Sequence, residues 1–146
     1  MASVHDVAAY ILARGGDMTA MKLQKLAYYS QAWHLVWSER ALFEEEIQAW
    51  ANGPVVYELY RIHQGQFRVS SWPDGNESNL SSDERSSVDA VMTAYEPFTA
   101  HQLSEMTHRE EPWLQARAGL ADGARSKRTI SLASMHEYYT SLTPSA

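Results

Sequence analysis

One segment in the first third of the chain constrains the fold more than any other feature. Over residues 22–37 apolar side chains recur at intervals of three and four, which is the spacing of a helix with one buried face. Thr19 precedes the segment and is a suitable N-cap residue. The pattern therefore predicts a helix over Lys22 to Trp37. Its expected core residues are Leu23, Leu26, Trp33 and Trp37.

The outer edge of the same helix is predicted to be exposed. Lys22, Lys25 and Tyr29 fall on one stripe by their three- and four-residue spacing. Such a stripe is usually a solvated surface. It can also bind acidic groups of another protein, or its lysines can pair internally with Glu45 or Glu46. The sequence leaves these three readings open.

Further helices are expected on both sides of this one. The first runs from Ser3 to the glycine pair at 15–16, and another starts near Pro54 and runs to Gly65. Ser81 with Glu84, and Thr99 with Gln102, have capping-box spacing and predict two more starts. The remaining helices are expected near Pro112 and around residues 135–142.

Two short segments read as strands rather than helices. Residues 47–50 alternate before the Asn52-Gly53-Pro54 turn, and residues 67–70 form a second candidate strand. Residues 70–82 are predicted to be a mobile loop because Pro73-Asp74-Gly75-Asn76 is turn chemistry. The expected fold class is mainly α: a compact helical single domain over residues 1–146 with a small two-stranded β element.

Composition excludes several classes of protein. The chain of 146 residues has no cysteine, so disulfides, thiolate metal sites and thiol nucleophiles are excluded, and a cytoplasmic location is the simplest expectation. No apolar run reaches the roughly 18 residues of a membrane span, and no signal peptide is recognised. A net charge of -6 makes nucleic acid an unlikely partner.

Catalytic and metal-binding patterns are equally weak. Six histidines are present, but none has the spacing of a metal site, and no phosphate-binding loop or serine-nucleophile motif occurs. His108 with Glu110 and Glu111 is the best candidate for acid–base chemistry. The simpler interpretation is that His108 orders a helix start and the glutamates favour its positive end. We therefore predict no catalytic residues, no cofactor and no metal.

The abundant aromatic residues suggest a protein interface. Tyr57 and Tyr60 lie beside Arg61, and tyrosine with arginine is the composition of interface hot spots. Large aromatic side chains also fill the cores of small domains, so interface and core both remain open for these tyrosines.

Several blocks of residues recur in a characteristic order over roughly Val4 to Tyr139. The first block is Met18-Thr19 followed by Lys22-Leu23-Gln24-Lys25-Leu26, Tyr28-Tyr29 and Gln31-Ala32-Trp33. The later blocks are Leu42-Phe43, Glu45-Glu46, Gln48-Ala49-Trp50, Gly53-Pro54-Val55-Val56 with Tyr60, Leu103-Ser104, Thr107-His108, Pro112-Trp113 and Ala116-Arg117. Together these ordered blocks resemble the Panacea domain of SocA-like antitoxins.

The resemblance implies an antitoxin that neutralises a cognate toxin protein by direct binding. Such toxins include small alarmone-synthetase-like enzymes that block translation. Two residues of the matching blocks, His108 and Arg117, join the candidate partner-binding residues because of this resemblance. The full set is Lys22, Lys25, Tyr29, Tyr57, Tyr60, Arg61, His108 and Arg117.

Three alternatives to direct neutralisation stay open. The chain can act as a proteolytic adaptor that presents the toxin to a Clp-type protease. It can be a small enzyme that reverses the toxin's product through His108 with Glu110 or Glu111. It can also be a structural or phage-associated interaction protein without a toxin. Homo-oligomerisation is not decided by the sequence.

Overall fold

The computed structural model describes residues 2–144, and this part of the chain is mainly helical, as predicted. Seven α-helices and two small antiparallel sheets lie within it. The helices are α1 Val4–Gly15, α2 Ala20–Ser38, α3 Tyr57–His63, α4 Ser82–Tyr95, α5 Ala100–Thr107, α6 Glu111–Ala116 and α7 Leu132–Ser141. The strands are β1 Met18–Thr19, β2 Ile47–Trp50, β3 Gly53–Val56 and β4 Arg68–Val69, and a 3₁₀ turn covers Glu77–Asn79.

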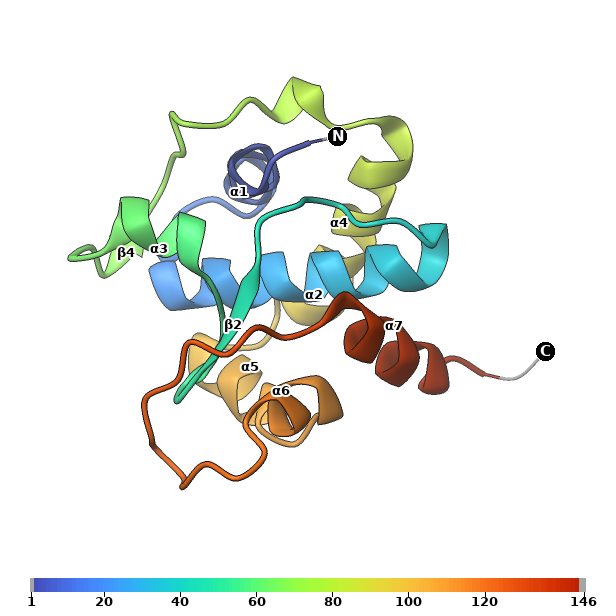
Figure 1. Cartoon of the computed structure of the whole chain (residues 1–146). Helices are drawn as coiled ribbons and strands as arrows, with labels where there is room; N and C mark the ends of the chain where they lie inside the picture. The colour runs from blue at the N-terminus through green and yellow to red at the C-terminus, as the bar shows by residue number, and fades with distance from the viewer. Residues whose placement is uncertain (1, 145–146) are drawn as a thin grey trace.

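Helix α2 is the centre of the structure. Figure 1 shows it running through the middle, with α1 on one side and α5 and α6 on the other. Helices α4 and α7 also pack against it. Every residue from Leu23 to Ala32 is buried, so this part of α2 is covered on all sides. No helix within residues 2–144 has the length and apolar character needed to cross a bilayer.

Helix starts follow the predicted caps. The Thr19 hydroxyl accepts a hydrogen bond from the amide of Lys22 at 3.1 Å. Complete capping boxes begin α1 at Ser3, α4 at Ser81 and α5 at Thr99. Each cap satisfies amides that the first helical turn leaves without a partner. These predicted boundaries are confirmed.

The core predictions for α2 are only partly right. Leu23 and Leu26 are fully buried, and Trp33 packs against the core from a half-buried position. Trp37, however, is 49% exposed, so its assignment to the core is wrong. It lies in the last turn of α2 and stacks on Trp33, with ring centroids 5.5 Å apart.

The predicted third helix starts later than expected. Pro54, Val55 and Val56 belong to strand β3, which pairs with β2 in register Ile47 to Val56. Helix α3 begins only at Tyr57. The strand forms because its backbone finds partners in β2 and in α2, which outweighs the helix-start preference of proline.

Two buried glutamines of α2 hold the chain that crosses it. Gln24 bonds both backbone groups of Val56, with its amide nitrogen 3.1 Å from the carbonyl oxygen and its own oxygen 2.8 Å from the amide nitrogen. Gln31 similarly donates to the carbonyl of Phe43 and accepts from the amide of Leu42. These side chains are buried because their polar atoms are satisfied by backbone groups.

A second small sheet joins the start of α2 to a distant segment. Strand β4 pairs antiparallel with β1, with Met18 opposite Val69 and Thr19 opposite Arg68. The strand predicted over residues 67–70 is therefore present but shorter. The structure contains two small two-stranded sheets where one was expected.

The loop predicted to be mobile is anchored to α1. Trp72 is buried and its indole nitrogen donates to His5 Nδ1 at 3.0 Å. The Asp6 carboxylate accepts from the amide of Asn76 at 2.8 Å. Gly75 lies so close that a β-carbon there would be 1.9 Å from the carbonyl oxygen of His5. The loop therefore packs directly on the backbone of α1.

Candidate protein-interaction site

The predicted exposed stripe on α2 is not exposed. Lys25 and Tyr29 are completely buried, so the exposure predicted for both is wrong. The reason is that the β2–β3 hairpin, α5 and α7 cover this side of α2. Only Lys22, half-buried in the first turn of α2, reaches the surface.

Lys25 is satisfied by backbone rather than by a carboxylate. Its ammonium group donates to the carbonyl of Pro54 at 3.2 Å and lies 3.0 Å from the sulfur of Met21. Burial lowers the pKa of Lys25 to about 7. The alternative pairing of the lysines with Glu45 or Glu46 is not found within residues 2–144, where these glutamates bond Val4, Gln48 and Thr129.

Tyr29 belongs to a buried polar cluster. Its hydroxyl donates to Glu110 Oε1 at 2.8 Å, and the hydroxyl of Tyr139 donates to the same oxygen at 2.8 Å. The Tyr28 hydroxyl lies 3.1 Å from that of Tyr139, and the Tyr95 ring stacks on Tyr29. Burial raises the pKa of Glu110, and burial, followed by nearby charge, raises the pKa values of Tyr28, Tyr29 and Tyr139. The cluster joins α2, α4, α7 and the residue that precedes α6.

Replacement of Glu110 by alanine is expected to lower the free energy of unfolding by roughly 3 kcal/mol, because two buried hydroxyls lose their acceptor. Glu110→Gln keeps a carbonyl acceptor and is expected to lose less. The measurement is urea unfolding of both variants. Glu105→Ala, at an exposed site on α5, is the control. A Glu110→Ala variant no less stable than this control would contradict the assigned role.

Tyr57, Tyr60 and Arg61 all lie on α3, and the ring centroids of the two tyrosines are 6.2 Å apart. Tyr57 is 42% exposed, and Arg61 is exposed and bonds Glu58 at 2.6 Å. The Arg61 guanidinium, followed by His5, lowers the pKa of Glu58 to about 2. Tyr60 is half-buried and packs edge-to-face on Trp50, with centroids 4.8 Å apart.

His108 and Arg117 have mainly structural contacts. The His108 ring stacks on Trp113 at 4.3 Å, and burial lowers its pKa. Arg117 is buried and donates to the carbonyls of Ala49 and Ala124 at 3.0 and 2.7 Å. These bonds hold the segment after α6 against β2, so Arg117 stabilises the fold rather than presenting a charge at the surface.

The acid–base arrangement suggested around His108 is not assembled. Within residues 2–144 no hydrogen bond or ion pair joins His108 to Glu110 or Glu111. His108 Nε2 is the one buried side-chain nitrogen or oxygen of this part that has no hydrogen-bond partner. The same residues contain no group of three or more acidic or histidine side chains able to hold a metal ion.

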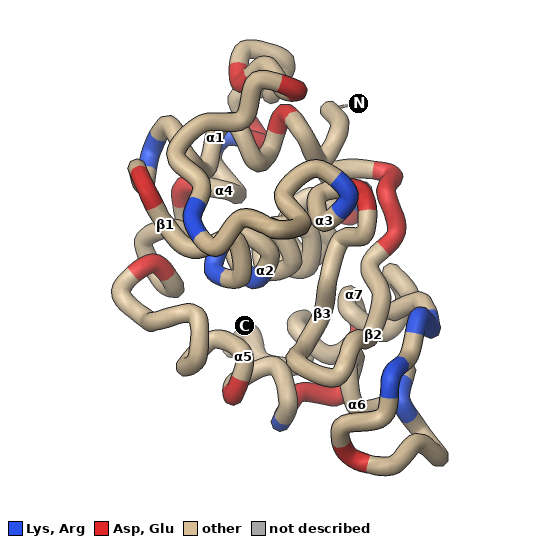
Figure 2. Tube along the Cα trace, turned by 90° about the vertical axis from the view of Figure 1, so that its left-hand side faces the viewer, with Lys and Arg blue, Asp and Glu red and all other residues tan. Residues whose placement is uncertain are grey.

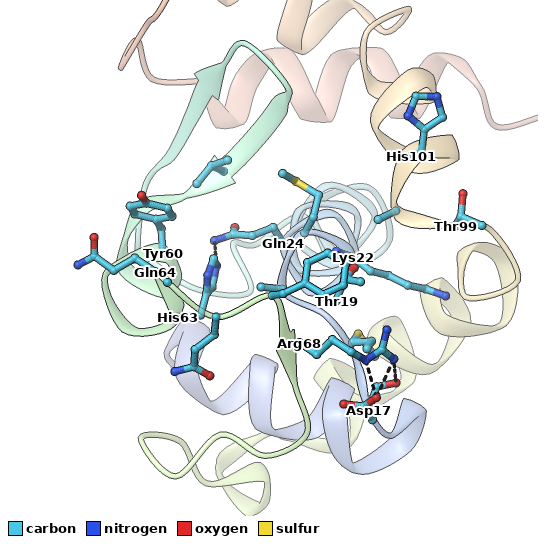
Figure 3. Close-up of a pocket in the computed structure, with 18 of the residues that line it drawn as sticks. Asp17, Thr19, Lys22, Gln24, Tyr60, His63, Gln64, Arg68, Thr99 and His101 are labelled. Atoms are coloured by element: carbon cyan, nitrogen blue, oxygen red, sulfur yellow. Dashed lines mark hydrogen bonds and ion pairs between the residues drawn. The ribbon is translucent and has the colours of Figure 1, made fainter.

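Lys22 and Tyr60 do come together, in a groove beside the start of α2. The groove has a volume of about 670 Å³ and a mostly apolar surface. In Figure 3, Tyr60 and Gln64 lie on one wall, and Thr99 and His101 of α5 lie on the opposite side. Lys22, at the start of α2, lies between them.

A second depression of about 510 Å³ continues this groove. The two share four residues, Met21, Trp50, Val55 and Tyr60. We call the joined depressions the Met21 groove. Its far end is lined by Arg125, Ser126 and Lys127 from the loop after α6. Figure 2 shows basic residues in blue beside α6 and at the start of α2.

Most of the groove was missed by sequence reasoning. Met21, Val55 and Phe67 were not selected, although Phe67 is 78% exposed and was expected in a strand. Residues 125–128 were not selected either, although three of these four residues are basic. The available signal was the apolar side chains of Val55 and Phe67, but the approach of their segments to α2 depends on strand pairing between distant parts of the chain.

The family comparison gives one match. The profile of the family described as "Antitoxin SocA-like, Panacea domain" matches residues 23–114. This range begins within α2 and includes both strands of the hairpin and helices α3, α4 and α5. No curated protein and no solved structure matches the chain.

Proposed function

Because the chain belongs to the SocA-like antitoxin family with a Panacea domain, we propose that it neutralises a cognate toxin by binding it directly. Family membership supports the antitoxin role in general. The direct mode of action is supported by the Met21 groove, an open and mostly apolar surface beside the most deeply buried helix. Open apolar surface of this kind is typical of protein interaction sites.

The accessible surface of the chain is large enough for such a complex. A specific interface buries about 800 Å² on each partner. The chain exposes 7532 Å², so an interface of standard size covers roughly a tenth of it. The groove and the exposed side chains around it, including Tyr57 and Phe67, provide the anchors for a patch of that size.

Co-expression with the product of the neighbouring gene tests the proposal. That product is expected to stop growth alone, to be harmless when this chain is present and to co-purify with it. The expected target class is a translation-blocking, small alarmone-synthetase-like enzyme. A harmless pair that fails to co-purify would contradict direct binding.

A titration with purified proteins separates the three mechanisms. Direct binding predicts that toxin activity falls in proportion to added antitoxin and ends at a fixed molar ratio, with no protease present. An adaptor protects only when the Clp-type protease is added. An enzyme that reverses the toxin's product protects at far less than one equivalent, and His108→Ala then abolishes protection while the complex persists.

A further inference from the structure

We propose that the Met21 groove binds a segment of the toxin in which apolar side chains are flanked by aspartate or glutamate. This inference rests on the proposed function, because it identifies the surface and the chemistry by which the toxin is recognised. Three observations carry it: the exposed apolar side chains, the charge of the rim, and the geometry of the aromatic rings.

Large apolar side chains are partly exposed along the groove. Phe67 is 78% exposed and Met21 is 37% exposed, and both line the groove. The carbonyl of Phe67 accepts a hydrogen bond from the amide of Ala20 at 2.9 Å, which holds this residue at the rim of α2. Val55 and Trp50 complete the floor. Burial of such side chains by a partner is the main source of interface affinity.

The rim is basic although the chain as a whole is acidic. The groove is lined by four lysine or arginine residues and one carboxylate, in a chain whose net charge is -6. The basic residues are Lys22, Arg68, Arg125 and Lys127, and the carboxylate is Asp17.

Part of this charge is already engaged inside the chain. Asp17 pairs with Arg68 at 2.7 Å, and Lys22 donates to the carbonyl of Glu96. His101 lies 3.6 Å from Glu105. Arg125 and Lys127 are exposed and face the groove from its far end, so they are the charges that remain for a partner. An acidic partner segment is complementary to them.

The groove fits a protein segment better than a nucleic acid. Trp50 and Tyr60 meet at an interplanar angle of 65°, so they do not form the parallel platform on which successive bases stack. Met21 and Val55 add aliphatic floor, which suits Leu-like or Met-like side chains. The acidic net charge also opposes binding to a phosphate backbone.

Matched charge reversals test the rim. The double variant Arg125→Glu/Lys127→Glu is expected to bind the purified neighbouring-gene toxin about tenfold more weakly or worse, with the loss mainly in the association rate and smaller at high salt. Arg40→Glu/Arg109→Glu makes the same charge change at exposed positions outside the groove. This control is expected to remain within about threefold of wild type.

Matched truncations of two aromatic residues test the apolar part of the groove. Phe67→Ala is expected to weaken toxin binding by about tenfold or more, the effect of losing an interface anchor. Trp37→Ala removes an exposed aromatic residue about 24 Å along α2 from Met21 and is expected to leave affinity unchanged. Phe67 is 78% exposed, so Phe67→Ala is expected to keep the wild-type melting temperature, whereas Trp37→Ala loses the stacking contact with Trp33 and is expected to lower it slightly.

Overlapping synthetic peptides from the toxin test the chemistry of the occupant. Peptides that bind the wild-type chain and fail to bind Arg125→Glu/Lys127→Glu are expected to combine apolar residues with Asp or Glu. Basic binding peptides, or equal toxin affinity of the groove and control variants, would overturn the inference and leave the proposed function intact. The inference would also be overturned if the wild-type chain bound a single-stranded oligonucleotide and Arg125→Glu/Lys127→Glu lost that binding while its affinity for the toxin was unchanged. Failure of the wild-type chain to bind the toxin would overturn both.

Discussion

Replacing Lys25 by methionine is expected to increase the free energy of unfolding at pH 7 by about 2–4 kcal/mol. The lysine is completely buried, and no carboxylate in the described chain pairs with it. Its protonated form is therefore costly, since an unpaired buried charge loses its hydration. Methionine has a similar shape and carries no charge. The lost bond to the carbonyl of Pro54 offsets part of the gain.

The pH dependence of stability distinguishes this charge effect from improved packing. The pKa of Lys25 is about 7 in the folded chain and 10.5 is its ordinary value, so the unfolded chain binds more protons between these pH values. Wild-type stability should consequently rise with pH, by up to about 1.4 kcal/mol per unit for this group. The stability advantage of Lys25→Met should shrink as pH increases from 7 to 9.5.

The measurement is urea unfolding at several pH values in that window. Higher pH is avoided because burial raises the pKa of Tyr28 and Tyr29, which reverses the slope once tyrosines of the unfolded chain ionise. Lys127→Met, at an exposed position, is the control and should give a curve parallel to wild type. A constant difference between Lys25→Met and wild type across the window would contradict the charge mechanism.

Replacing Gly75 by valine is expected to cost about 3 kcal/mol or more of unfolding free energy. The nearest atoms to an added β-carbon are backbone atoms of α1, 1.9 Å from the carbonyl oxygen and 2.3 Å from the carbonyl carbon of His5. Backbone cannot move aside as a flexible side chain can, so the loop must separate from the helix. Separation also removes the bonds that Asp6 accepts from Asn76 and Asn79.

Thermal unfolding of Gly75→Val checks this expectation, with Gly119→Ala as control. Gly119 has a positive φ of 84° but open space around it, so alanine there should cost only about 1 kcal/mol of backbone strain. Equal losses in the two variants would show that close packing of the loop on α1 is not important for stability.

Local sequence patterns predicted the elements well where local chemistry decides them. Capping residues gave the starts of α1, α2, α4 and α5, because a cap bonds amides only two or three residues away. The alternating segment at residues 47–50 became β2. Such features need no knowledge of distant partners.

The same patterns failed where distant segments meet. A periodic sequence indicates a helix with one buried face. Residues 23–32 of α2 are buried on all sides, so a polar side chain in this helix is not necessarily an exposed one. Lys25 and Tyr29 are buried because Pro54 and Glu110, far along the chain, accept their hydrogen bonds. Their separations of 29 and 81 residues place these partners beyond any local rule. The groove was missed for the same reason, since its walls come from four separate segments.

The backbone clamp that Gln24 and Lys25 make on β3 also determines how the groove meets a partner. Bonds to Pro54 and Val56 fix the strand that carries Val55, so the floor is already in its bound arrangement before association. A partner then loses little free energy to ordering of this backbone. The exposed side chains of Phe67 and Lys127 at the rim still lose conformational freedom when they are covered. A partner segment is thus accommodated by rotamer choice at the rim over a fixed strand backbone.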